Sequence, residues 1–127
     1  MTRLTPADPG VHATLGFALL LPNRRDFDRA WAEFREAARL KPDLALTWVG
    51  IGSVYMVKGD VDSAIKEFSY ALTLDPRLAF AHFQLGLAHL KKGNRRVALN
   101  QLHLACELEP SSSLFRTEYE RLLRQQN

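Results

Sequence analysis

The histidines and the single cysteine have the most reactive side chains of this sequence. The histidines are His12, His82, His89 and His103. His82 and His89 are seven residues apart, so a helix would place both on one face, where imidazoles can bind a transition metal. No carboxylate stands at a ligand-like offset on that face, and both histidines occupy positions that aromatic residues hold elsewhere in the chain. We therefore expect packing residues at the edge of the core, with no metal and no cofactor.

Cys106 is the only cysteine, so no disulfide can form within the chain, which suits a reducing compartment. It falls on an apolar helix face, which is typical of a buried small residue and not of a nucleophile. No glycine-rich phosphate loop is present, and serine, histidine and aspartate do not occur in an order that suggests a triad. The sequence predicts a protein that is not an enzyme.

Basic side chains gather at three short stretches, the third of which is residues 91–96. Aspartates accompany the first two stretches but not the third. Both a solvated turn and a contact with an acidic partner are consistent with this candidate basic edge, made of Lys91, Lys92, Arg95 and Arg96. No aromatic residues are interleaved with it, so we expect no nucleic acid binding.

Composition and charge set wide limits. The net charge is +3, and 46% of the residues are hydrophobic, as in ordinary globular domains. The longest apolar run, residues 15–21, is too short to cross a bilayer, so we expect no membrane insertion. With Arg3 upstream, this run has some likeness to a signal peptide. The same residues fit the repeat described next, and we expect a cytoplasmic protein.

The elements that must position these side chains recur every 34 residues. In blocks that begin at Val11, Ala45 and Ala79, residues of one type fall in register three times without a gap. They are Ala30, Ala64 and Ala98; Ala37, Ala71 and Ala105; Leu40, Leu74 and Leu108; Pro42, Pro76 and Pro110; and the bulky apolar Phe34, Phe68 and Leu102. Such a period indicates a stacked array of supersecondary units.

Each block is predicted to form two antiparallel helices, because the stretches between them are short. In the second block, Gly59 can end the first helix because glycine adopts the left-handed conformation without steric cost. Asp60 or Asp62 can cap the next helix, and Pro76 ends it. Small residues at one position of each helix let the two backbones approach closely.

The series Trp48, Ile51, Gly52, Tyr55, Gly59, Asp60, Ala64, Phe68, Ala71 and Pro76 resembles the tetratricopeptide repeat (TPR). The resemblance covers about residues 11–112 and implies an all-α fold, a right-handed superhelix of helix pairs. The chain then divides into an N-terminal lead-in (1–10), three repeats (11–44, 45–78 and 79–112) and a C-terminal capping helix (113–127). Glu120 stands where the repeats have a small residue, so we expect nothing to pack closely beyond the cap.

The first block departs from the pattern. A gapless register places Phe17, Ala18 and Leu21 inside, whereas a two-residue insertion places Leu15, Gly16 and Leu19 inside. Asp8 and Pro9 start the helix in either case. Its turn has no glycine, and Asn23 is the predicted left-handed residue.

The resemblance also implies where a partner binds. In proteins of this family a second stripe on each first helix lines a concave groove that receives a peptide or helix. Here the stripe comprises Leu46, Val49, Ser53, Met56, Phe80, Phe83, Leu87 and Leu90, and seven of these eight residues are apolar. Three interpretations remain open: neighbouring helices cover the stripe, another protein's apolar segment binds it, or a second copy does.

The sequence therefore predicts a non-enzymatic adaptor that binds an apolar peptide or amphipathic helix. The alternative is a self-associating scaffold subunit, a homodimer or larger assembly, that uses the same groove. Family members that act as co-chaperones hold a partner's terminal carboxylate with Lys, Arg and Asn side chains. The corresponding residues here are Leu15, Leu19, Gly50, Phe80 and Gln84, so we expect no binding of that kind.

Overall fold

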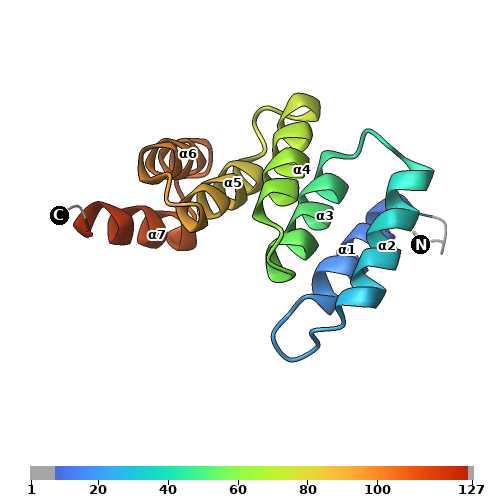
Figure 1. Ribbon diagram of the computed structural model, residues 1–127. Helices are drawn as coiled ribbons and strands as arrows, with labels where there is room; N and C mark the ends of the chain where they lie inside the picture. Colours follow the sequence, from blue (N-terminus) through green and yellow to red (C-terminus); the bar gives the residue numbers. More distant parts are fainter. Residues whose placement is uncertain (1–7, 126–127) are drawn as a thin grey trace.

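In a computed structural model, residues 8–125 are described, and they form seven α-helices and no strand. The helices are α1 (Pro9–Leu19), α2 (Phe27–Leu40), α3 (Ala45–Val57), α4 (Val61–Leu74), α5 (Ala79–Lys91), α6 (Arg95–Leu108) and α7 (Ser113–Arg124). They stack in chain order as three antiparallel pairs followed by α7, and the two ends of the chain lie far apart (Figure 1). The predicted all-α superhelix of helix pairs is confirmed. Among the described residues, no helix is long and apolar enough to cross a membrane.

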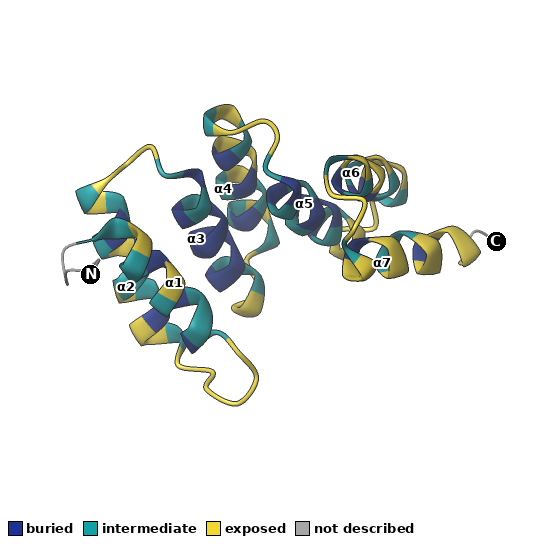
Figure 2. Ribbon diagram, turned by 180° about the vertical axis from the view of Figure 1, so that it is seen from behind, coloured by how far each residue is buried: buried dark blue, intermediate teal, exposed yellow. Residues whose placement is uncertain are grey.

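The core is a row of large side chains that insert from the second helix of each pair against a glycine of the first. Phe34, Phe68 and Leu102 occupy equivalent positions in α2, α4 and α6, and all three are almost fully buried. A Cβ atom added to Gly52 would lie 2.5 Å from the Phe68 ring, and one added to Gly16 would lie 2.6 Å from the Phe34 ring. Because any side chain would collide there, these glycines allow the helices to pack closely. The buried residues accordingly lie along the facing sides of the helices (Figure 2).

The register of α1 is the one with a two-residue insertion. Gly16 contacts Phe34 as Gly52 contacts Phe68, whereas Leu21, which the gapless register places inside, is 53% exposed. One hydrogen bond also recurs in every pair: the amides of residues 26, 60 and 94 donate to the carbonyl oxygens of residues 19, 55 and 89, each at 2.9 Å. Residue 19 is therefore equivalent to residue 55, which is 36 positions later, although the second helices repeat at 34.

The turn between α1 and α2 absorbs the extra residues. It spans residues 20–26, whereas the equivalent turn between α3 and α4 spans residues 58–60. The prediction of Asn23 as the left-handed residue is wrong, because Arg25 has the positive φ, at 49°. Arg25 precedes Gly59 (φ 87°) by 34 residues, so it takes the place that glycine holds in the other two turns.

Capping residues begin the helices at the predicted places. The Asp8 carboxylate accepts a hydrogen bond from the Gly10 amide at 2.8 Å, with Pro9 as the first residue of α1. Asp60, and not Asp62, caps α4 by accepting from the Ser63 amide at 3.2 Å. These bonds satisfy amide groups that have no partner within the helix.

Helix α7 covers the end of the third repeat. Phe115 stacks on Phe83 with the ring centroids 4.7 Å apart, and Leu122 is buried in the same cluster. The Arg95 guanidinium of α6 donates to the Leu122 carbonyl oxygen and so holds the last turn of α7. Glu120 is exposed, as expected for a terminal cap.

Candidate functional site

The predicted groove stripe divides into a buried part and an accessible part. Val49, Ser53 and Phe83 are buried between helices, and Phe83 is further covered by Phe115. The other members are Leu46, Met56, Phe80 and Leu87, which are partly buried, and Leu90, which is 37% exposed. Neighbouring helices therefore cover three residues of the stripe, and five remain within reach of a partner.

Phe17 and Leu20 also belong to this face, and sequence reasoning missed them. The register of α1 makes Phe17 equivalent to Ser53 and Leu20 equivalent to Met56. The Phe17 ring lies 5.9 Å from the Phe80 ring of α5, edge to face, and 5.0 Å from the Phe34 ring. The concave face is thus bridged from the first repeat to the third by two phenylalanines. The signal that would have found them is the glycine alignment of Gly16 with Gly52.

A hollow of about 260 Å³ lies beside these two rings. It is lined by Phe17, Leu20, Leu21, Pro22, Ser53, Val57, Phe80 and Gln84. The Gln84 amide donates to Ser53 Oγ at 2.8 Å, and Ser53 Oγ donates to the Val49 carbonyl oxygen at 3.0 Å. The polar atoms of the wall are therefore engaged with one another, and the rim that contacts a partner is apolar.

The candidate basic edge is less basic than its sequence suggests. The expectation of no acidic residue near the third turn is wrong, because Lys92 forms an ion pair with Asp62 of the preceding repeat. Lys58 and Asp28 form the equivalent pair at 3.9 Å, 34 residues earlier. Stacking brings these groups together although 30 residues separate them in the chain.

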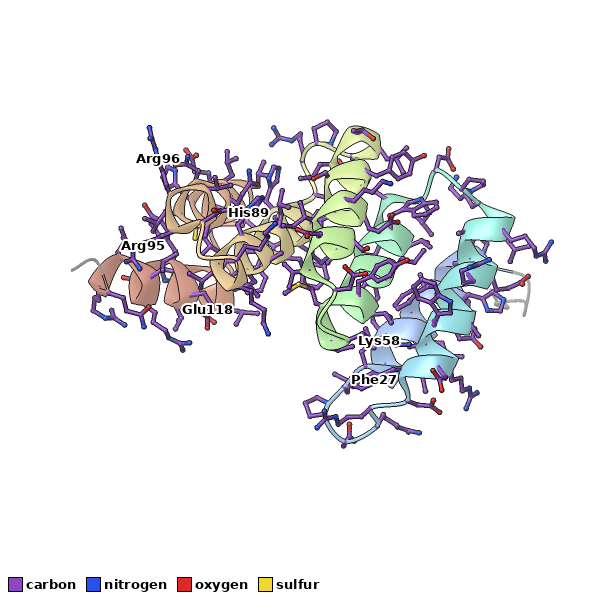
Figure 3. All side chains as sticks on the ribbon, viewed as in Figure 1. Phe27, Lys58, His89, Arg95, Arg96 and Glu118 are labelled. Carbon is purple, nitrogen blue, oxygen red and sulfur yellow. The ribbon has the colours of Figure 1, made fainter. Side chains whose placement is uncertain are left out.

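Arg95 and Arg96 point in different directions (Figure 3). Arg95 lies between α6 and α7, where its guanidinium is engaged with Leu122, and Arg96 projects outward from α6. Among the residues that the structure describes, only Lys91 and Arg96 of the four candidates make no ion pair or side-chain hydrogen bond. Two charges in isolation form a weak electrostatic site, so the edge offers little to an acidic partner.

The histidines and the cysteine occupy structural positions. His82 Nδ1 lies 2.7 Å from Gln101 Oε1, and His82 Nε2 lies 3.0 Å from the Pro76 carbonyl oxygen. Burial lowers the pKa of His89, and the charge of Lys92 lowers it further. Burial raises the pKa of the Cys106 thiol, which disfavours the reactive thiolate. Within residues 8–125, no three histidine, cysteine or acidic side chains lie close enough together to hold a metal ion.

Comparisons with known proteins agree on the fold. The TPR repeat family model matches residues 52–93, and no protein with a curated description matches the sequence. The Arabidopsis OM64 TPR domain superposes with a TM-score of 0.79 at 18% identity, over 91% of this chain and 94% of that one. The first TPR of Spaghetti (RPAP3), bound to an HSP90 peptide SRMEEVD, gives 0.79 at 15% identity, over 98% and 97%.

A longer structure contains the same arrangement as one part. A chain of the APC/C hetero-tetramer Cut9-Hcn1 gives a TM-score of 0.77 at 25% identity over 94% of this chain, but only 24% of that chain is covered. Together, these matches confirm the resemblance drawn from the 34-residue pattern, including three helix pairs and a capping helix.

Proposed function

We propose that this chain, which has the TPR fold, is a non-enzymatic adaptor that binds an apolar peptide or amphipathic helix of another protein in its concave groove. The observation that carries the proposal is the apolar, accessible rim around the hollow, where Phe17 and Phe80 meet. Accessible apolar surface of this kind marks sites of protein association. TPR domains are in general interaction modules, and the adaptor is proposed to act in the cytoplasm.

The shape of the groove defines the kind of ligand. Leu46, Met56, Phe80, Leu87 and Leu90 present aliphatic and aromatic surface along α3 and α5. The hollow beside Phe17 and Phe80 suits one large apolar side chain, such as leucine or phenylalanine, inserted as an anchor. An amphipathic helix supplies such residues at spacings of three and four, which matches recognition of a helix in a groove.

An acidic C-terminal peptide, like the one bound to the Spaghetti domain, is not the proposed ligand. With the register seen in the structure, the first two positions of the family's carboxylate-binding set are Ala13 and Phe17 instead of Leu15 and Leu19. The remaining three are Gly50, Phe80 and Gln84. None of the five is positively charged, so a terminal carboxylate would lose its hydration without gaining a cationic partner.

Self-association through the same face remains the alternative function. Leu21 and Val57 at the rim of the hollow are half exposed, and Leu90 extends the apolar surface along α5. Light scattering after size-exclusion chromatography, over a wide range of concentration, distinguishes the two functions. A monomer at all concentrations supports a foreign partner, and a dimer that Leu90→Glu dissociates supports the scaffold.

The test of the adaptor begins with peptides selected on the wild-type protein from a display library. We expect the selected sequences to share large apolar residues at helical spacing. Leu90→Glu should weaken their binding at least about tenfold, because it places a charge against buried apolar surface. Leu104→Glu is the matched control, since Leu104 of α6 is similarly exposed, at 39%, but lies outside the groove.

Phe83 is a poor probe of the groove. It is buried and stacked on Phe115, so a charge at this position would disrupt the attachment of α7 as well as any binding surface. Equal loss of peptide binding in Leu90→Glu and Leu104→Glu, with both variants folded, would rule the groove out as the binding site.

A further inference from the structure

One polar contact is made in the first and third repeats but not in the second. Residues 33, 67 and 101 are equivalent positions in α2, α4 and α6, and each lies opposite residue 12, 48 or 82 of the preceding helix. His12 Nδ1 lies 2.6 Å from Glu33 Oε2, and His82 Nδ1 lies 2.7 Å from Gln101 Oε1. In the first and third repeats, a histidine therefore satisfies the side chain at this position.

The second repeat has Trp48 in place of the histidine. Its indole has a single N–H, which donates to the Pro42 carbonyl oxygen at 2.7 Å. Trp48 therefore has no donor left for Glu67, whose carboxylate makes no hydrogen bond and no ion pair with any described residue. Burial raises the pKa of Glu67, while the charge of Lys66 opposes this effect. The carboxylate is partly withdrawn from water without a partner, so a cation placed beside it would be stabilising.

Glu67 forms one wall of a pocket of about 370 Å³. We call this the aromatic pocket; it is lined by Trp31, Arg35, Ala38, Trp48, Ile51, Tyr55 and Glu67. Trp31 and Tyr55 meet edge to face with centroids 5.3 Å apart. Trp48 is held from behind by Tyr70 at 5.1 Å. Trp48, Ile51 and Tyr55 lie on the face of α3 opposite the groove stripe, so the aromatic pocket is separate from the peptide groove.

We propose that the aromatic pocket binds an organic ammonium group, with Glu67 as the counter-charge and the rings of Trp31, Trp48 and Tyr55 as walls. Aromatic faces attract cations electrostatically, and indole does so most strongly. A methylated ammonium also buries apolar surface against the rings and Ile51, which a metal ion or a protonated water-like cation does not. The site combines these features with a carboxylate that has no partner of its own.

Arg35 provides internal evidence that the pocket attracts cations. Its guanidinium carbon lies 5.9 Å from the centre of the Trp31 ring. Arg35 is exposed, so it can move away, and while in place it repels a second cation. Removal of its charge should therefore tighten binding, which is the opposite of what loss of a structural residue does.

Tryptophan fluorescence reports on this pocket directly, because Trp31 and Trp48 are the only tryptophans of the chain. The protein is titrated with choline chloride at constant ionic strength, with sodium chloride as the balance. The control ligand is 3,3-dimethylbutan-1-ol, which has the shape of choline without its charge. We expect saturable binding of choline, at least about tenfold tighter than binding of the neutral alcohol.

Three variants assign the binding to residues. Glu67→Gln should weaken choline binding about tenfold without harming the fold, because Gln101 shows that the position accepts glutamine. Glu33→Gln, at the equivalent position of the first repeat, should leave it unchanged. Arg35→Gln should tighten it several-fold. The absence of saturable binding, equal binding of the neutral alcohol, or unchanged binding in a folded Glu67→Gln would each overturn the proposal.

The ammonium group can come from a free small cation or from a methylated lysine of a protein. Titration with Nα-acetyl-Nε-trimethyllysine amide separates these sources. Binding tighter than that of choline supports a protein side chain, and weaker binding supports a free cation. Failure of both probes to bind overturns the site itself, and the groove proposal is unaffected by that result.

Discussion

Gly50 offers the sharpest test of how the first two repeats pack. A Cβ atom at Gly50 would lie 2.2, 2.4 and 2.5 Å from three carbon atoms of the Phe34 ring. The ring cannot retreat, because a Cβ atom at Gly16 on α1 would also approach it to 2.6 Å. Phe34 is fully buried with its ring edge between two glycine backbones of different repeats. Gly50→Ala therefore forces either the ring or the helix α3 to move.

The expected magnitude follows from two opposing effects. Alanine favours an α-helix over glycine by about 1 kcal/mol. Overpacking of a rigid core costs roughly 1–3 kcal/mol, and distances this short belong at the upper end. We expect Gly50→Ala to lower the free energy of unfolding by about 1–2 kcal/mol in total. Gly86→Ala should cost less, because its nearest neighbours lie at 3.1 Å or more and the closest is a flexible leucine.

Urea denaturation of a double-mutant cycle measures this coupling. Phe34→Leu alone should destabilise, because it leaves a cavity, but it should relieve Gly50→Ala in the double variant. Leucine is a realistic replacement, since Leu102 holds the same position in the third repeat. The packing described for Phe34 is wrong if Gly50→Ala is no worse than Gly86→Ala, or if the two changes at residues 34 and 50 are simply additive.

Three further changes test other features of the fold. Arg25→Gly should raise the free energy of unfolding by about 0.5–1 kcal/mol, since the left-handed conformation costs arginine more than the 5.7 Å contact of its guanidinium with Phe27 returns; thermal melting measures it. Thr47→Val should stabilise by about 1 kcal/mol in urea denaturation, because the Thr47 hydroxyl is fully buried without a partner. Glu67→Gln should stabilise at neutral pH. The raised pKa of Glu67 means that its ionised form is disfavoured by folding, so the advantage of glutamine should disappear as acid protonates the wild-type carboxyl, as melting curves across pH would show.

The helix pairs were predictable because one rule fixes them all. The 34-residue recurrence of Ala64, Phe68 and Pro76 in α4 has counterparts in α2 and α6, and each copy supports the others. The register of α1 was not fixed by this rule, because a turn can lengthen by two residues without leaving a mark in the helices it joins. The exchange of glycine for Arg25 in that turn removed the remaining local signal.

The site was predictable only in its outline. The stripe on α3 and α5 follows from helical spacing, but its division into covered and accessible residues depends on neighbours such as Phe115 on α7. The ion pair of Lys92 with Asp62 likewise depends on how one repeat is stacked on the next. The unpartnered state of Glu67 depends on where the one N–H of Trp48 points, which spacing alone does not specify.

The central claim, that the groove receives an apolar segment, is tested most directly by the methyl resonance of Met56. The chain has two methionines, Met1 and Met56, so a protein with ¹³C-labelled methionine methyl groups gives two signals, and Met56→Leu assigns them. On titration with a selected peptide, we predict a saturable shift of the Met56 signal with the same midpoint as binding. A peptide that binds while the Met56 signal stays in place would contradict the groove as the site of recognition.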